Sequence, residues 1–325
     1  MTDEIAAPLL SLPGAAFGAE TRAFWYEGEG GLRLRAALCP ARDPVGSVVL
    51  NPGRTEPIEK YVEVVAELNA RGFTVLIHDW RGQGRSTRLL ADALRGHADG
   101  FDPFLADFRR LLDRCEDDLP GPRLLLANSM GGALSLAALA RGEARFSAAL
   151  LSAPMLGLKA GDRPAWQARL AAGLMRRLGR GGDYVLGGAT DPFAARFETH
   201  ALTHDRARFD RALAHIQADR ALGLGNVTWG WLSAAYRLTG QLSRPGALET
   251  IAVPVVILAA GEERLVSNAA SQAMAARLPK GRYVEVPGAF HEIMMETDAL
   301  RAPFWAEFDR LAASVGAKPR DERRV

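Results

Sequence analysis

Short apolar runs alternate with longer stretches of mixed polarity along most of the chain. The apolar runs cover residues 32–38, 47–50, 74–77, 123–126, 148–151, 255–258 and 283–286. Short runs of this kind are typical of buried strands, and the stretches between them have the spacing of helices. The alternation predicts an α/β fold with a mostly parallel sheet and helices on both of its faces.

The alternation stops between residues 154 and 250, where arginine-rich, helix-like sequence with several tryptophans takes over. We therefore expect a core of residues 1–153 and 251–325 with an inserted helical cap, or lid, of residues 154–250. In this cap Trp166, Leu170 and Leu174 recur at helical spacing, while Arg169 and Arg176 share another face. The apolar face could lean on a lipid surface or admit an acyl chain, or it could pack on the core beneath it.

The stretch from Ala127 to Gly132, which reads Ala-Asn-Ser-Met-Gly-Gly, directly follows an apolar run. It is close to the G-x-S-x-G nucleophile elbow, in which small residues let the chain turn from strand to helix and expose the serine. Ala127 replaces the first glycine. Ser129 is therefore a candidate nucleophile, and the alternative is a serine that caps the start of a helix.

A serine nucleophile needs a histidine base, which in turn needs a carboxylate. The strand predicted at 255–258 leads into Gly261-Glu262-Glu263, and the strand at 283–286 leads into a loop with His291. The order serine, acid, histidine is the one found with a nucleophile elbow. We favour Glu263, the third residue of a G-x-E pattern, over Glu262, and the two acids could also be a solvated pair. Met295 breaks the H-E-x-x-H zinc pattern that starts at His291, so no metal site is expected.

These three segments, together with the turn His78-Asp-Trp-Arg-Gly-Gln-Gly-Arg-Ser86, resemble the α/β-hydrolase superfamily and its bacterial lysophospholipase and monoacylglycerol lipase branch. The resemblance covers residues 23–313. It implies an α/β-hydrolase fold that needs no cofactor, with Ser129 attacking an ester, His291 moving the proton and Glu263 orienting the histidine. We interpret the turn as structural, with Arg81 tying loops together.

The resemblance also places an oxyanion hole, formed by the backbone N–H groups of Arg54 and Met130. This chain has Pro52-Gly53 where many members carry His-Gly. The Arg54 side chain could bind a substrate phosphate or carboxylate at the mouth of the pocket, or merely reach solvent. Trp229, Trp231 and Tyr236 could line a substrate pocket or fill the core of the cap.

Composition and charge limit the classes of partner and the compartment that we expect for this chain. A net charge of +2, with no basic helix carrying interleaved aromatic residues, argues against nucleic-acid binding. The two cysteines fit a reducing cytoplasm, and the acidic start of the chain is unlike a secretory signal. We expect a cytoplasmic protein that contacts the inner membrane peripherally through its cap.

The sequence thus predicts a serine hydrolase of a lipid-like ester such as a lysophospholipid or monoacylglycerol. Two alternatives stay open at this point. An acyltransferase would share the same triad and differ only in the group that accepts the acyl chain. A non-catalytic receptor for a small ligand could use the same fold, although it would not need all three residues.

Overall fold

The computed structural model describes residues 5–159 and 164–320. The acidic start at residues 1–4 and the last residues of the charged tail, 321–325, lie outside the described residues. Within the described part, no helix is long and apolar enough to cross a membrane. Both cysteines, Cys39 and Cys115, are buried free thiols.

The described residues form an eight-stranded sheet with the strand order β1-β2-β4-β3-β5-β6-β7-β8. The strands β1 and β2 pair antiparallel, as do β2 and β4, and all other neighbours are parallel. Their bounds are β1 Arg22–Glu27, β2 Arg33–Cys39, β3 Gly46–Asn51, β4 Phe73–His78, β5 Arg123–Asn128, β6 Ala148–Ser152, β7 Val255–Ala260 and β8 Gly281–Val286.

The seven predicted strands are all present, and the prediction of a mostly parallel sheet is confirmed. Every residue of β3, β4, β6 and β7 is buried, as expected for strands covered on both faces. The apolar runs did not predict β1, which lies at the edge of the sheet. Phe24 and Tyr26 of β1 are buried while Arg22 and Glu27 at its ends are exposed, so it has the alternation of an edge strand rather than an apolar run.

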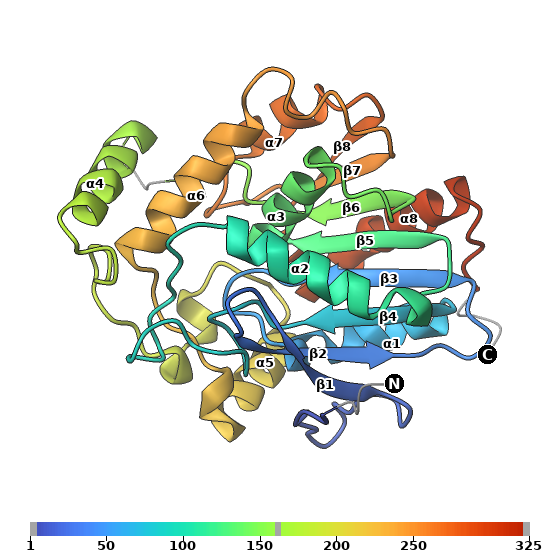
Figure 1. Cartoon of the computed structure of the whole chain (residues 1–325). Helices are drawn as coiled ribbons and strands as arrows, with labels where there is room; N and C mark the ends of the chain where they lie inside the picture. Colours follow the sequence, from blue (N-terminus) through green and yellow to red (C-terminus); the bar gives the residue numbers. More distant parts are fainter. Residues whose placement is uncertain (1–4, 160–163, 321–325) are drawn as a thin grey trace.

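Helices cover both faces of the sheet (Figure 1). The helices α1 and α8 pack on one face, and α2, α3 and α7 pack on the other. The helix bounds are α1 Val62–Ala70, α2 Asp102–Arg114, α3 Ser129–Ala140, α4 Ala165–Arg177, α5 Arg206–Ala218, α6 Trp229–Leu242, α7 Asn268–Ala275 and α8 Asp298–Ser314.

The segment predicted as a cap, residues 154–250, enters after β6 and returns to the sheet at β7. Its described part contains α4, α5 and α6 and no sheet strand. The helix α6 contacts α3 of the core, and α4 packs on α6 at the outside of the molecule (Figure 1). We call this segment the cap below.

The apolar face of α4 points away from the protein. Trp166, Leu170 and Leu174 are 60%, 64% and 57% exposed, and Leu178 just after the helix is 63% exposed. The helix packs on α6 through its opposite face, where Ala172 is fully buried. Packing of this face on the core, one of the interpretations that the sequence left open, is therefore wrong.

Candidate active site

Ser129 lies at a sharp turn between β5 and α3. It has a φ of +48°, a left-handed conformation that costs a non-glycine residue energy and that projects the side chain out of the turn. The turn also needs Gly131, because a Cβ atom there would lie 2.2 Å from the Asn51 carbonyl oxygen. Ala127, which replaces the first glycine of the motif, is fully buried. The sequence from 127 to 132 thus folds locally as the predicted elbow.

The structure brings the predicted serine, histidine and glutamate together, each at the carboxyl end of a parallel strand. His291 Nε2 lies 2.9 Å from Ser129 Oγ, and His291 Nδ1 lies 2.7 Å from Glu263 Oε2. The other oxygen of Glu263 accepts hydrogen bonds from the N–H groups of Leu265 and Val266. Burial opposes ionisation of Glu263, but His291 and these two N–H groups outweigh it and lower the pKa of the carboxyl.

The two neighbouring acids lie in different environments. Glu263 is 6% exposed and faces the imidazole, whereas Glu262 is exposed to solvent. The favoured residue is thus the one that contacts His291.

The loop after β3 lies against the elbow, where the sequence predicts an oxyanion hole. Among the described residues, neither the Arg54 N–H nor the Met130 N–H donates a hydrogen bond within the chain. The turn after β4 holds this loop in place. Trp80 Nε1 donates to the Pro52 carbonyl at 2.8 Å, and Gln83 Oε1 accepts from the Thr55 N–H at 2.8 Å.

The structural interpretation of that turn is confirmed. Arg81 donates to both carboxylate oxygens of Asp107 and to the Glu29 carbonyl, so it ties loops together. A Cβ atom on Gly84 would lie 2.1 Å from the Asp79 carboxyl carbon, so only glycine fits there. Because the turn supports the loop after β3, it shapes the site without entering it.

Ser129 and His291 open into a cavity of about 850 Å³ between the core and the cap. Its lining is mostly apolar, and Trp229 and Trp231 contribute to it. Both tryptophans are less than 10% exposed and belong to α6. A mostly apolar cavity with a few polar groups at one end is suited to a ligand with a long apolar part.

The half-buried Arg54 side chain lines this cavity. Its Nη1 donates to the Gly225 carbonyl of the cap at 2.7 Å, and the guanidinium lies 5.8 Å from the centre of the Trp231 ring. Burial lowers the pKa of Arg54 to about 10 although the nearby Glu56 carboxylate opposes this shift, so Arg54 stays charged at neutral pH. Within the described residues, no carboxylate lies within ion-pair distance of it.

Four charged residues of the cavity region were not predicted from the sequence. Glu56 and Glu292 line the cavity, and Lys60 lies between them, with Nζ 3.4 Å from Glu56 Oε1 and 2.5 Å from Glu292 Oε1. Lys159 also lines the cavity and donates to the Glu263 carbonyl. In the sequence these residues look like ordinary solvated charges, since only tertiary packing buries the first three.

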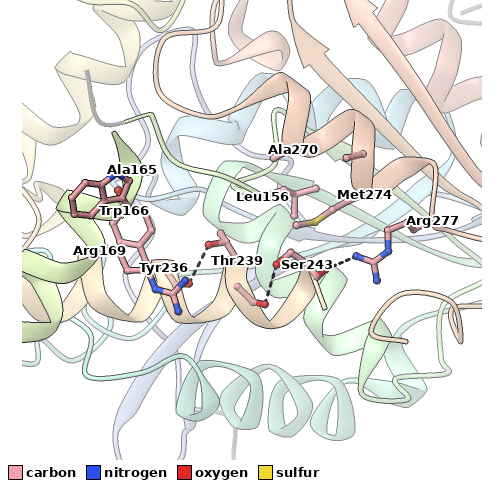
Figure 2. A pocket seen from close by; sticks show the side chains of 12 residues that line it. Leu156, Ala165, Trp166, Arg169, Tyr236, Thr239, Ser243, Ala270, Met274 and Arg277 are labelled. Carbon is pink, nitrogen blue, oxygen red and sulfur yellow. Dashed lines mark hydrogen bonds between the residues drawn. The ribbon is translucent and has the colours of Figure 1, made fainter. Parts of the chain in front are cut away.

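A second cavity, with a volume of about 470 Å³, lies along α6 and is lined by residues of α4, α6 and α7; we call it the groove (Figure 2). Trp166 and Arg169 of α4 lie on one side of it, and Leu156 and Met274 lie on the other. Tyr236 of α6 lines both this groove and the catalytic cavity. Trp166 therefore belongs to both the exposed face of α4 and the groove, and Tyr236 belongs to both the groove and the catalytic cavity.

Comparisons with known proteins agree with this geometry. Residues 42–298 match the model of the Hydrolase_4 family, described as serine aminopeptidase, S33. Lysophospholipase L2 of Escherichia coli (strain K12) is 36% identical over 265 residues, which is 78% of this chain and 76% of that protein. Monoacylglycerol lipase of Mycolicibacterium smegmatis is 28% identical over 278 residues, covering 84% and 91%.

Solved structures share the fold at lower sequence identity. A soluble variant of Saccharomyces cerevisiae monoglyceride lipase has a TM-score of 0.69 at 17% identity, covering 92% of this chain and 97% of that one. Paleococcus ferrophilus monoacylglycerol lipase has a TM-score of 0.67 at 20% identity, covering 86% and 98%. The chain therefore has the α/β-hydrolase fold, belongs to the Hydrolase_4 family and is a carboxylic-ester hydrolase.

Proposed function

We propose that this chain hydrolyses lipid-like carboxylic esters, either a lysophospholipid or a monoacylglycerol, through an acyl-enzyme on Ser129. The observation that carries the proposal is the hydrogen-bonded series Ser129, His291 and Glu263 at the base of a large apolar cavity. Relatives named lysophospholipase and monoacylglycerol lipase support the same substrate class.

The mechanism follows from the hydrogen bonds. Ser129 Oγ attacks the ester carbonyl carbon while His291 Nε2 takes the hydroxyl proton. The carbonyl oxygen becomes an alkoxide, which the N–H groups of Arg54 and Met130 stabilise, and Glu263 stabilises the imidazolium. Collapse of this intermediate releases the alcohol with the proton from His291. A water molecule then hydrolyses the acyl-enzyme by the same steps and releases the fatty acid.

Arg54, which has no carboxylate within ion-pair distance among the described residues, favours the lysophospholipid. A guanidinium in a mostly apolar cavity with no carboxylate in contact is stabilised by an anionic ligand, and a phosphate can accept charge-assisted hydrogen bonds from it. A monoacylglycerol offers no such charge. We therefore infer that the phosphodiester head group lies near Arg54 and that the acyl chain occupies the apolar part of the cavity.

The cap is proposed to contact an anionic bilayer through α4. Its exposed apolar residues recur every four positions, and exposed arginines flank them at 169, 176 and 177. A helix with this pattern lies in the membrane interface with its apolar face among the lipids. Trp166 belongs to both this face and the groove of Figure 2, so the groove is suited to receive a lipid that leaves the bilayer.

A substrate panel tests the proposed function. Long-chain lysophospholipids, monoacylglycerols and p-nitrophenyl esters would be assayed with the wild type and with Ser129→Ala. We expect turnover of all three classes by the wild type and almost none by the variant, whose folding circular dichroism would check. Activity retained by Ser129→Ala, or no turnover of any lipid ester by the wild type, would contradict the proposal.

A further inference from the structure

One buried carboxylate beside the site takes no part in the proton transfer. Glu56 is 3% exposed and lies in the segment between β3 and α1. Its Oε2 accepts hydrogen bonds from the Gly53 N–H and from the Tyr61 hydroxyl, the latter at 2.5 Å. Its Oε1 accepts from Asn128 Nδ2 at 2.9 Å and faces Lys60 Nζ at 3.4 Å. Four donors therefore converge on one carboxylate.

Two of these donors belong to the two segments that carry the proposed oxyanion hole. Gly53 directly precedes Arg54, and Asn128 precedes Ser129 and Met130 by one and two positions. The Glu56 carboxylate thus joins the loop after β3 to the nucleophile elbow. The approach at Gly53 is close, since a Cβ atom there would lie 2.6 Å from Glu56 Oε2.

The third donor extends the connection to the histidine loop. Lys60 Nζ lies between Glu56 and Glu292, and Glu292 directly follows His291. Burial would raise the pKa of the Glu56 carboxyl, but Lys60, the Tyr61 hydroxyl and the Gly53 N–H outweigh it and lower the pKa. Glu56 is thus an ionised acceptor.

We propose that Glu56 is a positioning residue that fixes the distance between the two N–H groups of the oxyanion hole. This inference rests on the proposed function, because it concerns a hole that only acyl transfer requires. Oxyanion donors act over about 2.7 to 3.1 Å, so a shift of the loop by a fraction of an ångström weakens them. No side-chain atom of Glu56 needs to touch the substrate for this role.

Glutamine cannot replace Glu56, although it has the same shape. If the amide oxygen faces Gly53 and Tyr61, the NH₂ group meets the Lys60 ammonium, which has no acceptor, and it can pair with Asn128 only if the Asn128 amide turns its Oδ1 toward it. If the amide is turned over, its NH₂ group meets the Gly53 N–H instead. Either orientation places donor against donor, so the loop has to move away from the elbow.

The test compares Glu56→Gln with the wild type by two inhibitors. A long-chain trifluoromethyl ketone reports on the oxyanion hole: Ser129 Oγ adds to its carbonyl carbon, the proton passes to His291, and the carbonyl π electrons become an oxyanion. A lysophospholipid analogue with an ether in place of the ester reports on the cavity alone. Active sites would be counted with a fluorophosphonate, so that kcat refers to folded enzyme.

We expect Glu56→Gln to lower kcat about tenfold or more with little change in KM, since loss of one oxyanion donor costs about 10² to 10³ in kcat. The ketone should lose affinity by a similar factor, and the ether analogue should stay within about twofold. Glu63→Gln is the matched control, because Glu63 pairs with Arg208 and Arg301 and does not contact the loop. Glu63→Gln should leave the affinity for both inhibitors unchanged.

Equal weakening of both inhibitors, or unchanged kcat per active site in Glu56→Gln, would overturn the proposal. If Glu56→Gln does not fold, Tyr61→Phe provides the test. Tyr61→Phe removes one of the four donors and should weaken binding of the ketone relative to the ether analogue, by a smaller factor. An unchanged ratio of the two affinities would again overturn the proposal. A wild type that the fluorophosphonate does not label at Ser129 would contradict the proposed function instead.

Discussion

Replacing Glu263 by glutamine sets its hydrogen bond to His291 against its hydrogen bonds to the backbone. One carboxylate oxygen accepts the His291 Nδ1–H at 2.7 Å, and the other accepts the N–H groups of Leu265 and Val266 at 2.7 and 3.3 Å. An amide has an acceptor on one side only. Glutamine can therefore satisfy the histidine or the two backbone groups, but not both.

The size of the effect follows from this competition. Turning the amide oxygen toward His291 places the NH₂ group against two backbone N–H groups. Each N–H group that loses its acceptor costs about 1 to 3 kcal/mol of free energy. The favoured orientation instead presents NH₂ to Nδ1. The imidazole then holds its proton on Nε2 and cannot accept the proton of Ser129. A penalty of about 2 to 6 kcal/mol corresponds to a loss in kcat of about 30-fold to 3 × 10⁴-fold.

The assay is hydrolysis of a p-nitrophenyl ester, expressed per active site. Glu262→Gln is the matched control, because this neighbouring side chain is exposed and does not contact the imidazole. We expect it to change kcat less than twofold. A Glu263→Gln variant within about threefold of the wild type, or a larger loss in Glu262→Gln, would refute the reasoning.

Three further predictions concern the nucleophile elbow, recognition of the substrate head group and the stability of the fold. Gly131→Ala should lower kcat about tenfold or more and reduce thermal stability, because its methyl group would lie 2.2 Å from the Asn51 carbonyl oxygen; Gly173→Ala, with open space around its Cβ, is the control and should be neutral or slightly stabilising. Arg54→Ala should raise the KM for lysophospholipid about tenfold or more and change that for monoacylglycerol less, as steady-state kinetics would show, and equal losses would mean that Arg54 only supports the cap. Burial opposes ionisation of Glu63, but Arg208, Arg211 and Arg301 lower its pKa to about 2, so the ionised group contributes about 2 to 3 kcal/mol above its unfolded pKa near 4.5. Urea unfolding should show this advantage over Glu63→Gln above about pH 5 and its loss as the pH falls toward 2, whereas a constant difference would contradict the ion pairs.

The sequence predicted the parts of the fold that local patterns encode. The seven apolar strands, the elbow at Ser129 and the strand ends with Glu263 and His291 all follow from apolar runs and short motifs. Parallel strands bring their carboxyl ends to one edge of the sheet, so residues 162 positions apart in the sequence, Ser129 and His291, could be expected to meet.

The rest depends on packing that no local pattern specifies. Glu56 and Glu292 are buried only because the loop after β3, the elbow and the histidine loop come together around Lys60. The direction of the apolar face of α4 was likewise undecided, since an amphipathic pattern is the same for a helix that packs inward and for one that faces a membrane. The role of Arg54 depends on Gly225 of the cap, which is distant in sequence.

Trapping the acyl-enzyme is the measurement on which the proposed mechanism depends. The protein would be mixed with a long-chain p-nitrophenyl ester, quenched in acid within the first turnovers and digested for mass spectrometry. We predict an added acyl mass on the peptide that contains Ser129. An acyl group on Ser135 or Ser152, or steady turnover by an enzyme that never carries the acyl mass at Ser129, would contradict the mechanism.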